Sequence, residues 1–159
     1  MADAGSLLGG LASGALIKKG WSINKARKVT LLVNALIILP VALVPVVADK
    51  WLAVFLIGVG AMGHQSWSIN SYTLVPDVFP KKATASVIGI GKMVGVAAAI
   101  AADFALGAVL DAADNSGYFW AFIIAGFSYI FILGFVHLLM PSMIPLDDNL
   151  KPIIKTPGK

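Results

Sequence analysis

The stretch from Trp51 to Leu74 decides the fold, and it reads WLAVFLIGVGAMGHQSWSINSYTL. It exceeds the roughly 20 residues that a helix needs to cross a bilayer, and it contains no Asp, Glu, Lys or Arg. Its second half carries a cluster of polar and amphipathic side chains: His64, Gln65, Trp67, Ser68, Asn70 and Ser71. Because polar groups are costly in hydrocarbon, such a cluster indicates a polar lining inside a helical bundle.

The rest of the chain has the composition of an integral membrane protein. Hydrophobic residues make up 58% of it and charged residues 13%, and long uncharged runs recur. These runs are too long for a two-layer soluble fold and lack a charged face. The predicted fold class is therefore all-α, a polytopic transmembrane helical bundle.

The motifs of enzymes and cofactor sites are missing from the sequence. There are no cysteines, which excludes disulfides and thiolate metal sites. No helix has a His/Glu metal spacing, and neither a Gly-x-Ser-x-Gly motif nor a phosphate-binding loop occurs. We expect no enzyme activity, no cofactor and no metal site.

Five spans of membrane length are predicted, followed by a tail. The spans cover residues 3–17, 29–47, 51–74, 83–109 and 119–139, and residues 1–140 form the membrane part. The tail, residues 141–159, contains four prolines and is predicted to be mostly irregular and cytoplasmic.

The basic residues predict the orientation of the chain. They form three groups that flank the apolar runs: Lys18, Lys19, Lys25, Arg27 and Lys28; Lys81 and Lys82; Lys151, Lys155 and Lys159. Five spans place all three groups on one side, which is then cytoplasmic. The opposite loops hold Asp49, Lys50, Asp111 and Asp114. This charge pattern reports topology, and no nucleic-acid partner is expected.

The same count puts the N-terminus outside, ahead of a short first span without a secretory signal. We therefore expect the chain to be the C-terminal part of a larger protein, with Met1 an internal residue. The alternative is a complete small five-span protein.

Small residues predict where helices pack closely. Gly5, Gly9, Gly10 and Gly14 form two Gly-x-x-x-Gly spacings, and Gly89 and Gly95 lie on a small-residue face of the fourth span. Asn34 is expected to make an interhelical hydrogen bond. The second and fifth spans are apolar all round and suit contact with lipid.

A candidate binding site follows from helical periodicity. At about 100° per residue, His64, Trp67 and Ser68 share one face, Gln65 lies at its edge and Asn70 falls outside it. Lys92, on the small-residue face of the fourth span, is expected at a similar depth.

These side chains suit a small polyhydroxylated anion. The Lys92 ammonium can meet a carboxylate, Gln65 and Ser68 can exchange hydrogen bonds with hydroxyls, and Trp67 offers a plate for a sugar ring. His64 can donate, accept or titrate. Two alternatives remain: His64 and Gln65 bond to neighbouring helices, and Lys92 pairs with an acid elsewhere or extends to the interface.

Two stretches resemble a known family. ADAGSLLGGLASGALIKKGWSINKARK and GHQSWSINSYTLVPDVFPKKATASVIGIG are similar to helices eight, ten and eleven of the hexuronate group of anion:cation symporters, in the major facilitator superfamily. The resemblance implies helices eight to twelve of a twelve-helix transporter in the cell inner membrane. It further implies proton-coupled uptake of sugar acids such as glucuronate and galacturonate, by alternating access between two six-helix halves.

The resemblance also implies partners and a loop motif. The partners are a small anionic substrate, protons, the lipid bilayer and the missing N-terminal half. The family's inner-loop pattern is matched by Gly10, Ser13, Gly14, Lys18, Lys19 and Arg27. Two positions depart from the family: Gly14 stands where an acid is common, and Lys92 where small residues are usual. The alternative function is a small, non-transporting accessory or assembly subunit.

Overall fold

The computed structural model describes residues 2–112 and 116–153, and over these ranges it is helical and contains no strand. The elements are α1 (Ala2–Lys18), α2 (Ile23–Ile38), the 3₁₀ helix η1 (Leu39–Val46), α3 (Lys50–Val78), α4 (Lys81–Ala112) and α5 (Ser116–Leu139). The predicted all-α class is confirmed.

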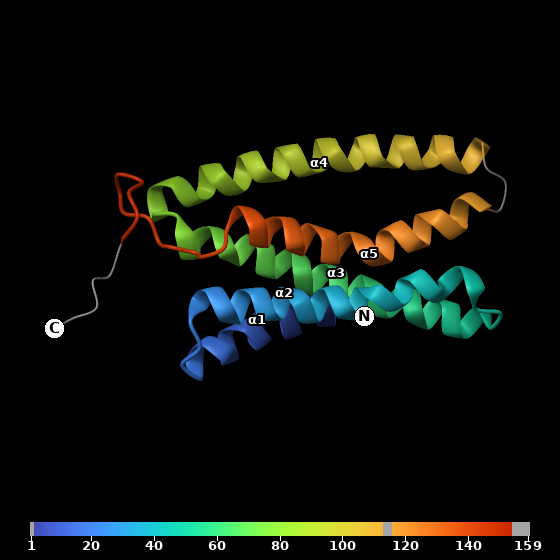
Figure 1. The fold of residues 1–159 in the computed structure, drawn as a ribbon, viewed down its shortest axis with the longest axis horizontal. Helices are drawn as coiled ribbons and strands as arrows, with labels where there is room; N and C mark the ends of the chain where they lie inside the picture. Colours follow the sequence, from blue (N-terminus) through green and yellow to red (C-terminus); the bar gives the residue numbers. More distant parts are fainter. Residues whose placement is uncertain (1, 113–115, 154–159) are drawn as a thin grey trace.

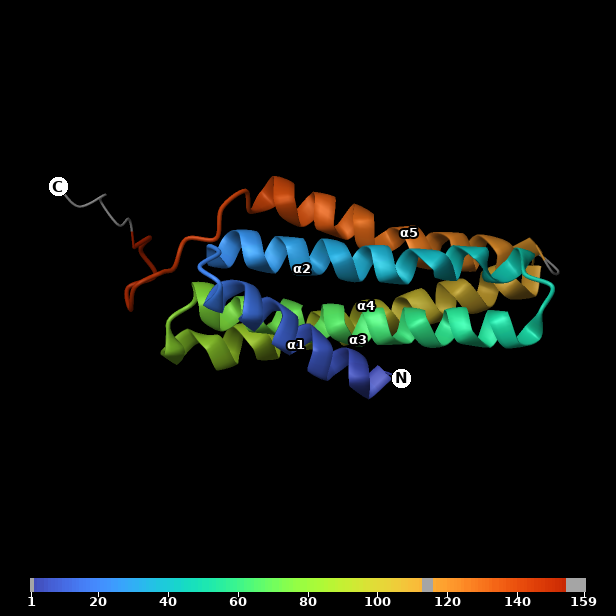
Figure 2. The ribbon, with the colours of Figure 1, turned by 90° about the horizontal axis from the view of Figure 1, so that it is seen from below.

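The long helices run antiparallel and form an elongated bundle (Figures 1 and 2). α1 is shorter than its neighbours and starts partway along the bundle (Figure 2). The end of α1 and the starts of α2 and α4 carry Lys or Arg and lie together, and α3 and α5 also end there. We call this the basic end. Of the basic and acidic loop residues named above, Asp114, Lys155 and Lys159 lie outside the described ranges.

The second predicted span differs in detail from the helix that forms. α2 begins at Ile23, six residues before the predicted start, because the Ser22 hydroxyl accepts a hydrogen bond from the Lys25 N–H and caps the helix. After Ile38 the chain continues as the 3₁₀ helix η1, which contains Pro40 and Pro45. Proline has no N–H to donate, so the α-helical pattern is interrupted here.

Packing is closest among α1, α2 and α3, and α5 covers α2 and η1. The buried apolar side chains include Ala26, Leu31, Ala35 and Trp67. α4 contacts α3 and α5, yet none of its residues is buried. The sequence favoured lipid contact for the second span and a packed face for the fourth. Within the described chain, α2 is the more enclosed of the two because its small and polar residues face α1 and α3.

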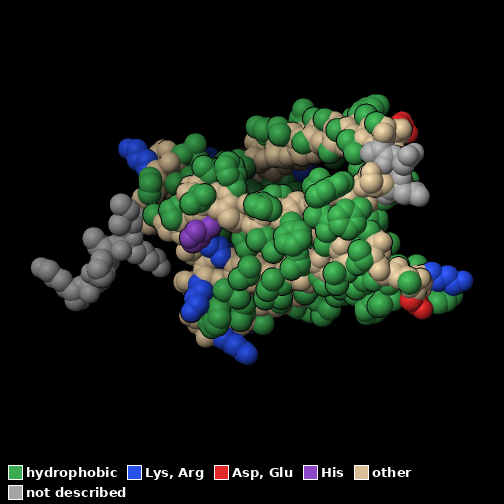
Figure 3. Space-filling view, turned by 45° about the vertical axis from the view of Figure 1, so that its right-hand side comes forward, with side chains coloured by type: hydrophobic (Ala, Val, Ile, Leu, Met, Phe, Trp, Pro, Cys, Tyr) green, Lys and Arg blue, Asp and Glu red, His purple; other side chains and the backbone are tan. Residues whose placement is uncertain are grey.

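Four segments of the described chain are long and apolar enough to cross a membrane: Ile23–Val46, Lys50–Val78, Lys81–Ala112 and Ser116–Leu139. Hydrophobic side chains cover most of the visible face in Figure 3, and Lys and Arg gather toward the ends. Such a surface suits a bilayer and not water. The protein is a multi-pass membrane protein.

Candidate functional site

α3 supplies most of the candidate residues, and its start is capped by Asp49. The Asp49 carboxylate accepts hydrogen bonds of 2.8 Å from the N–H groups of Trp51 and Leu52, an N-cap. The helix then continues without a break to Val78. Its buried residues are Gly60, Gly63, Ser66, Trp67 and Asn70. Asn70, which lies outside the predicted face, is thus buried against the neighbouring helices.

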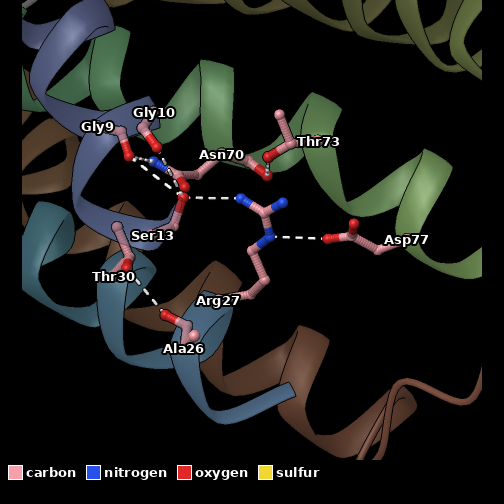
Figure 4. A network of polar contacts seen from close by, with 9 residues as sticks. All are labelled: Gly9, Gly10, Ser13, Ala26, Arg27, Thr30, Asn70, Thr73 and Asp77. Atoms are coloured by element: carbon pink, nitrogen blue, oxygen red, sulfur yellow. Dashed lines mark hydrogen bonds and ion pairs between the residues drawn. The ribbon is translucent and has the colours of Figure 1, made fainter. Parts of the chain in front are cut away.

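A polar network joins α1, α2 and α3 near the basic end (Figure 4). The Arg27 guanidinium lies at its centre. Its Nε donates to Asp77 Oδ2 at 2.8 Å, and its Nη1 donates to Ser13 Oγ at 2.7 Å. Arg27 is buried, and the side chain of Asp77 is 21% exposed. One cation therefore ties the start of α2 to the middle of α1 and the end of α3.

The network continues toward the bundle centre through amides. Asn70 Nδ2 donates to the Gly9 carbonyl at 3.0 Å and to the Ser66 carbonyl at 2.9 Å. The Ser66 hydroxyl donates to Asn34 Oδ1 at 2.8 Å. The predicted interhelical hydrogen bond of Asn34 is confirmed. These contacts satisfy Asn34 Oδ1 and Asn70 Nδ2, whereas Asn34 Nδ2 and Asn70 Oδ1 are buried without a hydrogen-bond partner in the described chain.

His64 and Trp67 both contact Tyr129 of α5. The His64 ring nitrogen Nδ1 is hydrogen-bonded to the Tyr129 hydroxyl. The Tyr129 ring meets the Trp67 ring edge to face, with centroids 5.2 Å apart. Trp67 is 9% exposed, whereas the His64 side chain remains exposed. His64 and Trp67 are therefore brought together, with α5 as their support.

The other three predicted site residues, Gln65, Ser68 and Lys92, are not held by side-chain hydrogen bonds within the described chain. Within the described part of the chain, the Gln65 amide and the Ser68 hydroxyl have no hydrogen-bond partner, and both residues are half-buried. The Lys92 ammonium lies over the Tyr72 ring, 4.8 Å from its centroid. Tyr72 is eight residues beyond His64, about 12 Å along the helix. Lys92 thus extends toward the basic end instead of lying level with His64 and Trp67.

The glycines divide into two groups. A Cβ on Gly5 would lie 2.1 Å from the Met62 carbonyl oxygen, and one on Gly9 would lie 2.2 Å from Ser66 Oγ. α1 and α3 therefore approach each other with room for hydrogen only. A Cβ added to Gly10 would have its nearest neighbour, a side-chain carbon of Ile69, 4.0 Å away. A Cβ added to Gly14, Gly89 or Gly95 would have no described atom within 4 Å.

The remaining loop residues lie at the basic end. Lys18 and Lys19 are exposed, unlike Arg27. The acid that meets Arg27 does not come from the position of Gly14. It is Asp77, which the sequence analysis did not single out. The two residues are 50 positions apart, so no local spacing reveals the pair. Tyr129 was missed because one hydroxyl on an apolar helix carries no signal of its own.

Comparisons with known proteins give one distant likeness. Over 136 residues, which cover 82% of this chain, the sequence is 26% identical to the protein named "Probable galactarate/D-glucarate transporter GudP" of Bacillus subtilis (strain 168). The match covers 30% of the length of that protein. No family model matches the chain. No solved structure matches it.

The likeness and the fold agree at a coarse level. A multi-pass helical chain with polar residues placed inside membrane-length helices fits part of a transporter.

Proposed function

We propose that this chain forms part of a secondary active transporter that carries sugar acids across a membrane by alternating access. The observation that carries the proposal is the likeness to a galactarate/D-glucarate transporter over most of the chain. The polar residues inside α3 support it, since a helix that faced only lipid would have no use for them.

The finer features of the proposal follow the family resemblance. The substrates are hexuronates or related polyhydroxylated organic anions, and a proton accompanies the anion. The basic end faces the cytoplasm of a cell whose inner membrane holds the protein. Further helices, equivalent to an N-terminal half, complete the pathway, because alternating access needs two halves that move against each other.

Each candidate residue has a stated role in this proposal. Lys92 attracts the carboxylate, while Gln65 and Ser68, whose polar groups are without partners in the described chain, bind substrate hydroxyls. Trp67 packs on the sugar ring, and His64 donates a hydrogen bond from Nε2. Tyr129 orients both of these rings.

The test is uptake of radiolabelled glucuronate and glucarate by cells that express the full open reading frame. We expect Gln65→Ala and Lys92→Ala to reduce uptake at least tenfold, with Lys92→Ala affecting the anions more than a neutral sugar. Lys82→Ala, an exposed lysine of the same helix, is the matched control and should transport normally.

Two outcomes count against the proposal. Full uptake by both variants would remove these residues from the site. A complete reading frame that encodes no further spans, together with no uptake, would favour the non-transporting accessory subunit.

A further inference from the structure

A groove on the outer surface of the bundle lies between α2 and α5, next to the basic end. Its volume is about 410 Å³. The residues that line it are Lys28, Val29 and Leu32 of α2 and Ile130, Leu133, Gly134 and His137 of α5. None of these residues belongs to the candidate transport site.

The polar end of the groove is cationic. Lys28 Nζ donates to the carbonyls of Met140 and Pro141, at 2.6 and 2.8 Å, and to His137 Nδ1 at 3.2 Å. These partners are neutral acceptors at the end of α5. In residues 2–112 and 116–153 the ion pair that forms is Arg27 with Asp77, so the charge of Lys28 is not neutralised by a carboxylate.

The contact with Lys28 also fixes the histidine tautomer. Nδ1 of His137 accepts from an ammonium, so the ring proton of neutral His137 sits on Nε2. The groove therefore ends in an N–H donor beside an uncompensated positive charge. Because the three N–H groups of Lys28 are already donated, a phosphate here would be held by the His137 Nε2–H and attracted by the charge of Lys28.

The rest of the groove is apolar. Val29 and Leu32 form one wall, and Ile130 and Leu133 form the other, while Gly134 leaves space between them. From His137 to Ile130 is seven residues, about 10 Å along α5. A groove about 10 Å long accommodates the part of an acyl chain that lies nearest the phosphate.

We propose that this groove binds an anionic phospholipid, with its phosphate at His137 and Lys28 and one acyl chain between α2 and α5. The charge at one end and the hydrocarbon wall below it match such a lipid in both chemistry and order. A second groove lies between α5 and the end of α2 with η1, and it is lined by Leu36, Leu39, Pro40, Ala42, Leu43, Ile123 and Phe127. It has no charged residue, so it would accept a chain without selecting a headgroup.

The test is native mass spectrometry of the purified protein titrated with phosphatidylglycerol or phosphatidylcholine. We expect wild type to retain phosphatidylglycerol preferentially, and Lys28→Gln to lower its retention about fivefold, the factor expected for one basic residue near an anionic headgroup. Lys25→Gln, an exposed lysine one turn away that does not line the groove, is the control and should behave as wild type.

A second variant tests the groove itself, because Lys28 also caps α5. Leu32→Trp fills the apolar wall on an exposed position and leaves Lys28 in place. We expect it to lower retention of phosphatidylglycerol as well. Equal retention of the two lipids by wild type would overturn the proposal. So would unchanged binding by Leu32→Trp, or equal losses for Lys28→Gln and Lys25→Gln.

Discussion

Arg27 shows how one side chain can organise three helices. Its guanidinium has donors on different edges, so it reaches Asp77 on α3 and Ser13 on α1 at the same time. Lys18 and Lys19, from the same loop motif, are exposed and cannot do this. The basic loop therefore contains residues of two kinds, and only the structure separates them.

We predict that Arg27→Ala lowers the free energy of unfolding by about 3 kcal/mol, because it leaves the Asp77 carboxylate poorly solvated and without its cation. Thermal unfolding in detergent, followed by circular dichroism, measures the change. Lys25→Ala removes an exposed cation from the same helix and serves as control. The prediction would be contradicted if the Arg27→Ala and Lys25→Ala variants unfolded at the same temperature.

Tyr129 gives a second prediction at the residue scale. Tyr129→Phe removes the hydrogen bond to His64 but keeps the ring against Trp67. We therefore expect it to lower the free energy of unfolding by about 1 kcal/mol or less. Tyr129→Ala removes both contacts and should expose Trp67.

The measurement is Trp67 fluorescence in a chain whose other tryptophans, Trp21, Trp51 and Trp120, are replaced by Phe. Emission should shift to longer wavelength in Tyr129→Ala and stay unchanged in Tyr129→Phe. A shift of equal size in both variants would mean that the hydroxyl, and not the ring, holds Trp67 in place.

At the scale of the elements, the packing of α1 on α3 depends on two glycines. Gly5 and Gly9 are one turn apart and meet the backbone of Met62 and the side chain of Ser66. A methyl group at either place would push the two helices apart and lengthen the Asn70 bond to the Gly9 carbonyl. Gly5 and Gly9 form one of the two Gly-x-x-x-Gly spacings, and the sequence alone could not say which of the four glycines are in contact.

We predict that Gly9→Ala destabilises the protein by about 1–3 kcal/mol through overpacking. Gly14→Ala, on the same helix, has no described atom within 4 Å of the added carbon. It should be neutral or slightly stabilising, since alanine favours a helix. The unfolding temperatures of the two variants, measured side by side in detergent, check the prediction. Equal destabilisation would show that helix propensity and not contact with α3 decides the effect.

For the molecule as a whole, the sequence predicted the class of fold and most of its division into helices, because apolar length is a direct signal of a membrane span. It did not predict which helices enclose which. Span 29–47 was predicted to face lipid, yet Thr30, Asn34 and Ala35 within it are buried. Contacts such as Arg27 with Asp77 and His64 with Tyr129 join residues at least 50 positions apart. Periodicity within one helix carries no information on them.

The basic end also predicts how the whole molecule lies in the membrane. Lys and Arg concentrate where α1 ends and where α2 and α4 begin, whereas the opposite loop between η1 and α3 holds Asp49 and Lys50. Since basic loops stay cytoplasmic, we predict opposite accessibility for two exposed positions, Ser142 and Ala48.

The chain has no cysteine, so Ser142→Cys and Ala48→Cys each introduce a single thiol. In intact cells a membrane-impermeant maleimide should label Ala48→Cys, and Ser142→Cys only after the membrane is opened. The reverse pattern would invert the proposed orientation, and labelling of both thiols in intact cells would contradict an odd number of crossings between them.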